Sequence, residues 1–266
     1  MIIKISADPI SLMIVFLTLI FVDVLICRKH RKEIRKRNEA ITKYNRIDLV
    51  TIRELIHENS DTISGLIKKI NALYSSVAEN IGLQDASQLK KNRKDLKKLE
   101  EEVHELKTEI YYFVRSLDGT SAETIKFYIS VLDYIHHMVQ SIGYIVKNSY
   151  VHVKSKQRNL RFNQIRDLRK IDDQLQILFS EIEKSLGGGS LEGIHSIIEE
   201  KTTLLEQISG LIGKQIDQSR SAQSNPKNNR LYFKLLLQTK DLITATMNLL
   251  CLLDEFHHSY KTVKTG

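Results

Sequence analysis

Apolar residues fill positions 10–27, and a basic segment follows at once with Arg28, Lys29, Arg31, Lys32, Arg35, Lys36 and Arg37. Eighteen residues of helix rise about 27 Å, close to the roughly 30 Å hydrocarbon core of a bilayer. The pattern predicts one transmembrane helix. A cleaved signal peptide would carry its charge before the apolar run, where only Lys4 stands. Because basic residues concentrate on the cytoplasmic side, we expect the N-terminus outside, the rest of the chain in the cytoplasm, and the basic segment on anionic lipid headgroups.

Three helical patterns follow in the first half of the chain. Apolar steps of three, four and seven from Ile52 to Val77 predict an amphipathic helix that ends near Gly82. A second helix keeps heptad order through Leu89, Leu96, Leu99, Val103, Leu106, Ile110, Phe113 and Leu117. A third, at about residues 121–152, is apolar over most of its circumference. Such a helix is expected at the centre of a bundle, with neighbours on several sides.

The second half repeats this order. Amphipathic helices are expected at about 160–186 and 190–220, and a very apolar helix at 231–256. The repetition predicts an all-α fold in which the transmembrane helix precedes two three-helix bundles. One continuous six-helix assembly is the alternative. The expected divisions are a short outer N-terminus, the transmembrane helix, a basic juxtamembrane segment, the two bundles and a tail, at residues 1–9, 10–27, 28–46, 47–154, 155–260 and 261–266.

Composition narrows the function classes. The chain has 11 Gly, 2 Pro and no Trp, which is typical of long helices. Its net charge of +8 comes largely from the basic segment, and elsewhere both signs alternate along helix faces. This pattern indicates solvated helix surface and no nucleic-acid partner. We find no nucleophile with a matching base and no phosphate-binding loop, so the sequence predicts no enzyme activity.

Two pairs of side chains suggest a metal site. Glu100 and His104 lie four residues apart on the second helix, and Asp133 and His137 lie four apart on the third. Carboxylate and imidazole groups on facing helices can close around one cation. The alternative is that these residues belong to a charged, solvated helix surface or pair with neighbouring lysines.

Several segments resemble a known module. They are residues 110–118 (IYYFVRSLD), 127–134 (FYISVLDY), 138–143 (MVQSIG), 162–168 (FNQIRDL) and 238–250 (QTKDLITATMNLL). Together they resemble the PhoU-like C-terminal domain of bacterial, Bacteroidetes-type PiT inorganic phosphate transporters, over roughly residues 47–256. The resemblance implies two three-helix bundles that regulate phosphate uptake. It also implies that residues 10–27 correspond to the last transmembrane helix of a transporter in the inner membrane.

The resemblance also bears on the metal. PhoU-like proteins carry Glu/Asp-x-x-x-Asp motifs on paired helices, and here His104 and His137 replace the second carboxylate. The corresponding positions in the second half read Glu200 with Leu204 and Gln238 with Leu242. The resemblance therefore implies that any metal lies in the first bundle, where mixed nitrogen and oxygen ligands favour zinc or iron.

The expected function is that of a membrane-anchored regulatory domain of a cation-coupled phosphate transporter. One predicted span cannot form a transport pathway, so the chain is expected to be a C-terminal fragment or a split subunit. Its expected partners are the transmembrane bundle of a phosphate permease or other membrane subunits, and a homo-oligomer is left open. No residue is assigned to phosphate binding. The alternative is a single-span helical scaffold or signalling protein that binds a partner protein.

Overall fold

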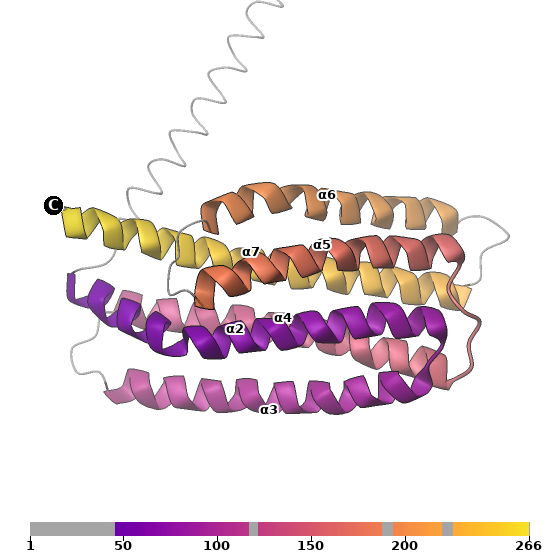
Figure 1. Cartoon of the computed structure of the whole chain (residues 1–266), viewed down its shortest axis with the longest axis horizontal. Helices are drawn as coiled ribbons and strands as arrows, with labels where there is room; N and C mark the ends of the chain where they lie inside the picture. The colour runs from indigo at the N-terminus through magenta and orange to yellow at the C-terminus, as the bar shows by residue number, and fades with distance from the viewer. Residues whose placement is uncertain (1–45, 117–121, 188–193, 220–225, 266) are drawn as a thin grey trace, which may run out of the picture.

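The computed structural model describes residues 46–116, 122–187, 194–219 and 226–265. These residues form six helices and no strand, so the all-α prediction is confirmed for the described part (Figure 1). The helices are α2 (Arg46–Leu83), α3 (Ala86–Ser116), α4 (Ala122–Lys154), α5 (Phe162–Gly187), α6 (Ile194–Ser219) and α7 (Pro226–Thr265). The predicted transmembrane helix at 10–27 and the seven basic residues after it lie outside the described residues. Among the helices that are described, none has the length and apolar character needed to cross a membrane.

The turn between α2 and α3 shows how local sequence sets the helix ends. The predicted stop at Gly82 lies inside the last turn of α2, and Gln84 instead adopts the left-handed conformation, with φ of 57°. Asp85 caps α3, because its Oδ1 accepts hydrogen bonds from the backbone N–H groups of Ser87 and Gln88 at 2.8 and 3.0 Å. Gly82 has another role. A Cβ there would meet Cγ2 of Ile165 at 3.2 Å, so glycine permits α2 to approach α5 closely.

The helices run side by side in an elongated bundle, with α3 and α6 on opposite outer sides (Figure 1). The most extensive contacts join α4 to α7 and α2 to α5. We call α2–α4 the first unit and α5–α7 the second unit. Corresponding helices of the two units therefore pack together, first against first and third against third.

One hydrophobic core runs through both units. Its buried residues form a single cluster, to which all six helices contribute. Each helix contributes residues with almost no exposed surface, for example Ile70, Leu99, Met138, Phe179, Ile208 and Leu236. The central position expected for the apolar third helix is observed, since α4 packs against α2, α3 and α7. The units thus share a core instead of each enclosing its own.

The two units differ in how they close. In the first unit each helix packs against both of the others. In the second unit α6 packs against α5 and α7, but α5 has little direct contact with α7 within the described residues. The apolar face of α5 is covered chiefly by α2 of the first unit, and α5 is joined to α7 by a hydrogen bond of 3.2 Å from the Tyr232 hydroxyl to Oδ2 of Asp167.

Polar side chains cross the boundary between the units. Tyr74 of α2 and Thr239 of α7 share a buried hydrogen bond of 3.1 Å between their hydroxyl oxygens. Ser75 of α2 donates a hydrogen bond to Oδ1 of Asp172 on α5 at 2.6 Å, and Gln176 donates to the Ser75 hydroxyl at 3.0 Å. Directional bonds of this kind fix the register of α2 against its partners.

The connection between the units is held by amide groups. Asn159 donates from its Nδ2 to the backbone oxygen of Gly82 at 2.9 Å and accepts from Gln84 at 3.2 Å. Asn228, in the first turn of α7, donates to the backbone oxygen of Asn159. A polar stretch of sequence is thereby fastened to the end of α2 and the start of α7.

Candidate functional site

A groove between α3 and α4 contains two of the four residues expected to bind a metal. Its volume is about 360 Å³. Glu100 and His104 line it from α3, and Val103, Lys107, His136, Val139, Gln140, Tyr144 and Lys147 complete the lining. We call it the α3/α4 groove. Its α3 residues are spaced three and four apart, so they share one face of the helix.

The other two predicted ligands do not line this groove. His137 and Asp133 are exposed, and the groove takes His136 from α4 instead. His137 is rotated by about 100° from His136 around the axis of α4, and Asp133 lies about one turn before His136 along the helix. The structure therefore does not bring the four residues together as one set. Among the described residues, no group of three or more His, Cys, Asp or Glu side chains could hold a metal ion. The zinc or iron prediction gains no support from the geometry.

The charge of the α3/α4 groove is unfavourable to a cation. The ammonium group of Lys147 lies 2.9 Å from Oε1 of Glu100 and neutralises the carboxylate. Burial, followed by the charges of Lys107 and His137, lowers the pKa of His136 below its ordinary value, and Asp133 only partly opposes this. Near neutral pH the groove thus contains two lysine ammonium groups, one carboxylate and a neutral imidazole at position 136.

Two of the positions in the second unit that correspond to the metal motif belong to the core. Leu204 and Leu242 are both buried. The side chain of Glu200 lies outside the described set, and Gln238 donates a hydrogen bond to Asp241 on its own helix at 3.1 Å. Leu204 and Leu242 thus contribute to the packing of the core.

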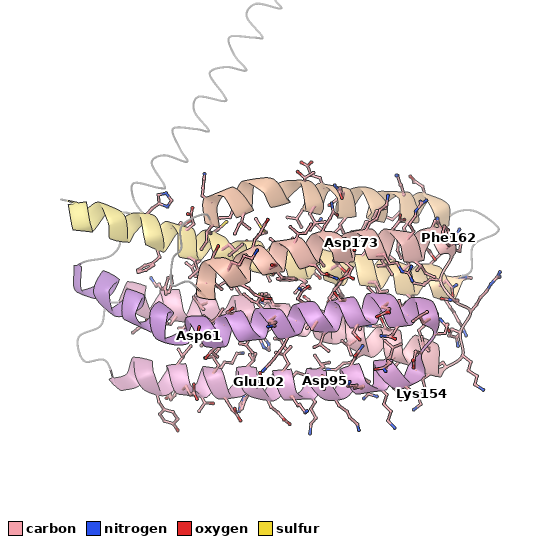
Figure 2. The ribbon with its side chains drawn as sticks, viewed as in Figure 1. Asp61, Asp95, Glu102, Lys154, Phe162 and Asp173 are labelled. Atoms are coloured by element: carbon pink, nitrogen blue, oxygen red, sulfur yellow. The ribbon has the colours of Figure 1, made fainter. Side chains whose placement is uncertain are left out.

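A second groove lies on the other side of α3, between α2 and α3. Its volume is also about 360 Å³. It is lined by Lys69, Ala72, Leu73 and Ser76 from α2 and by Gln88, Lys91, Asn92, Asp95, Lys98, Leu99 and Glu102 from α3. We call it the α2/α3 groove, and Asp95 and Glu102 mark its α3 side in Figure 2. Sequence reasoning did not single out this site. The available signal was a polar residue, Asn92, at heptad spacing between Leu89 and Leu96.

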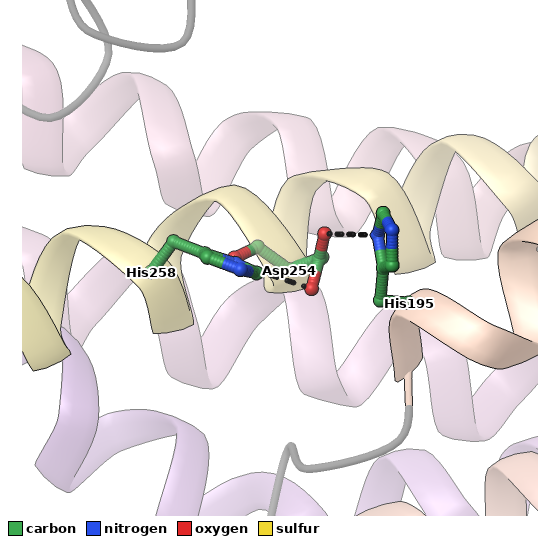
Figure 3. Close-up of polar contacts among 3 residues, drawn as sticks. All are labelled: His195, Asp254 and His258. Atoms are coloured by element: carbon green, nitrogen blue, oxygen red, sulfur yellow. Dashed lines mark hydrogen bonds and ion pairs between the residues drawn. The ribbon is translucent and has the colours of Figure 1, made fainter.

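A third cluster joins the start of α6 to the last turns of α7 (Figure 3). The carboxylate of Asp254 lies between two imidazoles: its Oδ2 is 3.5 Å from Nδ1 of His195, and its Oδ1 is 3.3 Å from Nδ1 of His258. The two rings meet edge to face, with centroids 6.4 Å apart. Of the two contacts of Asp254, only the one with His195 joins α6 to α7, because the Nδ1 of His258 also lies 2.9 Å from the backbone oxygen of Asp254 on its own helix. Burial, followed by the charges of Glu255 and Asp254, raises the pKa of the nearby Cys251 thiol, which disfavours a reactive thiolate.

Burial also shifts the pKa of several titratable groups at and near the boundary between the units. Burial raises the pKa of both Tyr74 and Tyr232, and the neighbouring Asp167 raises that of Tyr232 further. Burial likewise raises the pKa of Asp172, although hydrogen bonds from Ser75 and Gln176 oppose it. The described residues thus offer grooves with lysine and amide groups for binding, and their buried hydroxyls are poor nucleophiles.

Comparison with known proteins adds no relative: no protein-family model, no curated protein and no solved structure matches the chain. The resemblance to PhoU-like domains rests on the sequence segments quoted above.

Proposed function

We propose that the chain is a membrane-anchored regulatory domain that acts with a cation-coupled, PiT-type inorganic phosphate transporter. In this proposal its six helices are two copies of a PhoU-like three-helix unit, and residues 10–27 anchor them in the inner membrane. The role is regulatory binding, without catalysis and without a transport pathway in this chain.

The observation that carries the proposal is the pairing of corresponding helices. The sequence repeats the order amphipathic, amphipathic, apolar. In the fold the two first helices, α2 and α5, pack together, as do the two third helices, α4 and α7. This pairing is what a duplicated three-helix unit produces when its two copies bury their most apolar surfaces against each other.

The end of the bundle at which α2 begins is compatible with a tethered regulatory domain. The start of α2 and the end of α7 lie at the same end of the bundle (Figure 1). A membrane helix and basic segment preceding α2 would therefore tether the bundle by one end. Its long sides, including the charged surface of α3, would remain accessible to a transporter.

Co-purification tests this proposal. The full chain, tagged at its C-terminus, is extracted in detergent from cells and its partners are identified. We expect a multi-span phosphate permease to be recovered. A matched chain whose seven basic residues are replaced by Gln tests the membrane segment, and we expect it to recover less permease. Recovery of a histidine kinase or an unrelated scaffold, without any permease, would refute the proposal.

A second candidate is a single-span scaffold or signalling protein. It is favoured by α3, whose heptad seam, interrupted by Asn92, faces inward while charges of both signs cover its exposed side. Such a surface suits a helical partner protein. In the same experiment this candidate predicts a soluble or signalling partner whose recovery survives loss of the basic residues.

A further inference from the structure

The α2/α3 groove contains a polar group that the fold leaves unsatisfied. Asn92 occupies a position in the heptad seam of α3 where an apolar residue is expected. Its side chain is only 4% exposed and lines the groove. Oδ1 accepts a hydrogen bond from the Ser76 hydroxyl at 3.0 Å, but Nδ2 has no partner. Turning the amide over would satisfy Nδ2 and leave Oδ1 without its bond, so one atom of this amide lacks a partner in either orientation.

An unsatisfied buried amide is costly and calls for an explanation. If Asn92 served only to fix the register of α3 against α2, its hydrogen bond to Ser76 would suffice. A buried Nδ2 without a partner would then add a cost and no benefit. A hydrogen-bond acceptor bound in the groove would remove the cost. The apolar residues Ala72, Leu73 and Leu99 border the same space, so the bound group must also present carbon surface.

The charges around the groove indicate the sign of the ligand. Lys69 is already paired with Glu102 across the groove. Lys91 and Lys98 lie seven residues apart on α3 and have no ion-pair partner among the described side chains. Against them stands one carboxylate, Asp95. The unpaired charge that remains at the rim is positive, which favours an anion.

We infer that the α2/α3 groove binds a small organic anion, a carboxylate or phosphate carried on a short carbon skeleton. The carbon skeleton lies over Leu73 and Leu99. One oxygen accepts the hydrogen bond from Asn92 Nδ2, and the anionic group pairs with Lys91 and Lys98. This site is independent of the proposed role in phosphate transport, because it requires only the fold of the first unit.

The α3/α4 groove is an internal control. It has the same volume and contains two lysines, of which Lys147 is paired with Glu100, but none of the residues that line it has a buried polar atom without a partner. If lysines and volume alone were sufficient for binding, both grooves would bind anions equally. The inference predicts that the α2/α3 groove binds more tightly.

Isothermal titration calorimetry on the full chain in detergent tests the site, with glycerol 3-phosphate and succinate as probes and glycerol as the uncharged reference. We expect at least one anion to bind at millimolar concentration and glycerol not to bind. Asn92→Leu restores the apolar seam and should fold at least as stably as the natural chain, yet we expect it to weaken anion binding about tenfold. Lys98→Ala should weaken binding several-fold, and Lys147→Ala in the other groove should leave it unchanged.

The remaining outcomes refute the inference. Absence of binding by both anions refutes it outright. Binding that survives Asn92→Leu but falls with Lys98→Ala would show attraction to surface lysines only. Binding that falls with Lys147→Ala would assign the anion to the α3/α4 groove. If glycerol bound as tightly as the anions, the negative charge of the ligand would not contribute to binding.

Discussion

The first and second units have the same number of helices but close differently. In the first unit α2, α3 and α4 all contact one another, whereas in the second α5 depends on α2 of the other unit for most of its burial. The close approach of Gly82 to Ile165 and the bonds of Ser75 with Asp172 and Gln176 lie at this boundary. A duplicated sequence pattern therefore need not give two independent folding units. The second unit completes its packing only against the first.

Phe179→Ala should cause the largest loss in the free energy of unfolding, because it disrupts the core that the two units share. Phe179 is a fully buried side chain of α5. Its removal leaves a cavity in the shared core, and we expect a loss of about 3–5 kcal/mol in the free energy of unfolding. Chemical denaturation followed by circular dichroism measures it. Ile177→Ala, at a side chain that is 55% exposed on the same helix, is the control and should change stability by less than about 0.5 kcal/mol. Equal effects of the two substitutions would contradict the shared core.

Tyr74→Phe should give an intermediate effect. The substitution removes the buried hydrogen bond to Thr239. The Thr239 hydroxyl still donates to the backbone oxygen of Leu235 at 2.8 Å, so it is not left unsatisfied. We expect a loss of about 1 kcal/mol, measured by denaturation. Tyr111→Phe, at an exposed tyrosine of α3, is the matched control and should be neutral. A neutral Tyr74→Phe would mean that the hydroxyl bond does not help to hold α2 against α7.

The titration of Asp172 should give a smaller effect, seen in how the free energy of unfolding depends on pH. Burial raises its pKa in the folded chain above the ordinary value of 3.8. The folded state therefore keeps this proton to higher pH than the unfolded state. The stability that the group contributes is fully present below about pH 3.8 and is lost as the pH rises through the raised pKa.

The measurement compares the natural chain with Asp172→Asn in denaturation curves at several pH values. The free-energy difference between them should favour the natural chain most at low pH and shrink as the pH rises. Asp217→Asn, at an exposed position of α6, is the control for the loss of a surface carboxylate. A difference that grows with pH would contradict the assignment.

Lys147→Ala should give the smallest effect. The ion pair of Lys147 with Glu100 lies on the surface, where both side chains are about half exposed. Exposed pairs contribute under about 1 kcal/mol and are screened by salt. We expect a loss within that limit that disappears in high salt. A larger, salt-independent loss would mean that the α3/α4 contact is as important as the boundary between the units.

Local signals in the sequence predicted the helices well. The heptad order from Leu89 to Ile110 became the buried seam of α3, because periodicity directly specifies which face is covered. The pairing of α2 with α5 was not predicted, since it depends on side chains far apart in sequence, such as Ser75 and Asp172.

The candidate site was predicted only in part. Glu100 and His104 do share a groove, because residues four apart on one helix necessarily share a face. The choice of His136 over His137 depends on the rotation of α4 against α3, which the sequence does not specify. The carboxylate shared by His195 and His258 joins two helices and has no local signal at all.

The central claim is that the second unit depends on the first, and fragment complementation tests it most directly. Residues 155–266 are produced alone and then mixed with residues 46–154, and unfolding is followed by circular dichroism. We predict that 155–266 alone shows no cooperative transition and that mixing restores a single transition. If 155–266 alone unfolds cooperatively at the denaturant midpoint of the intact chain, the second unit folds independently and the claim is wrong.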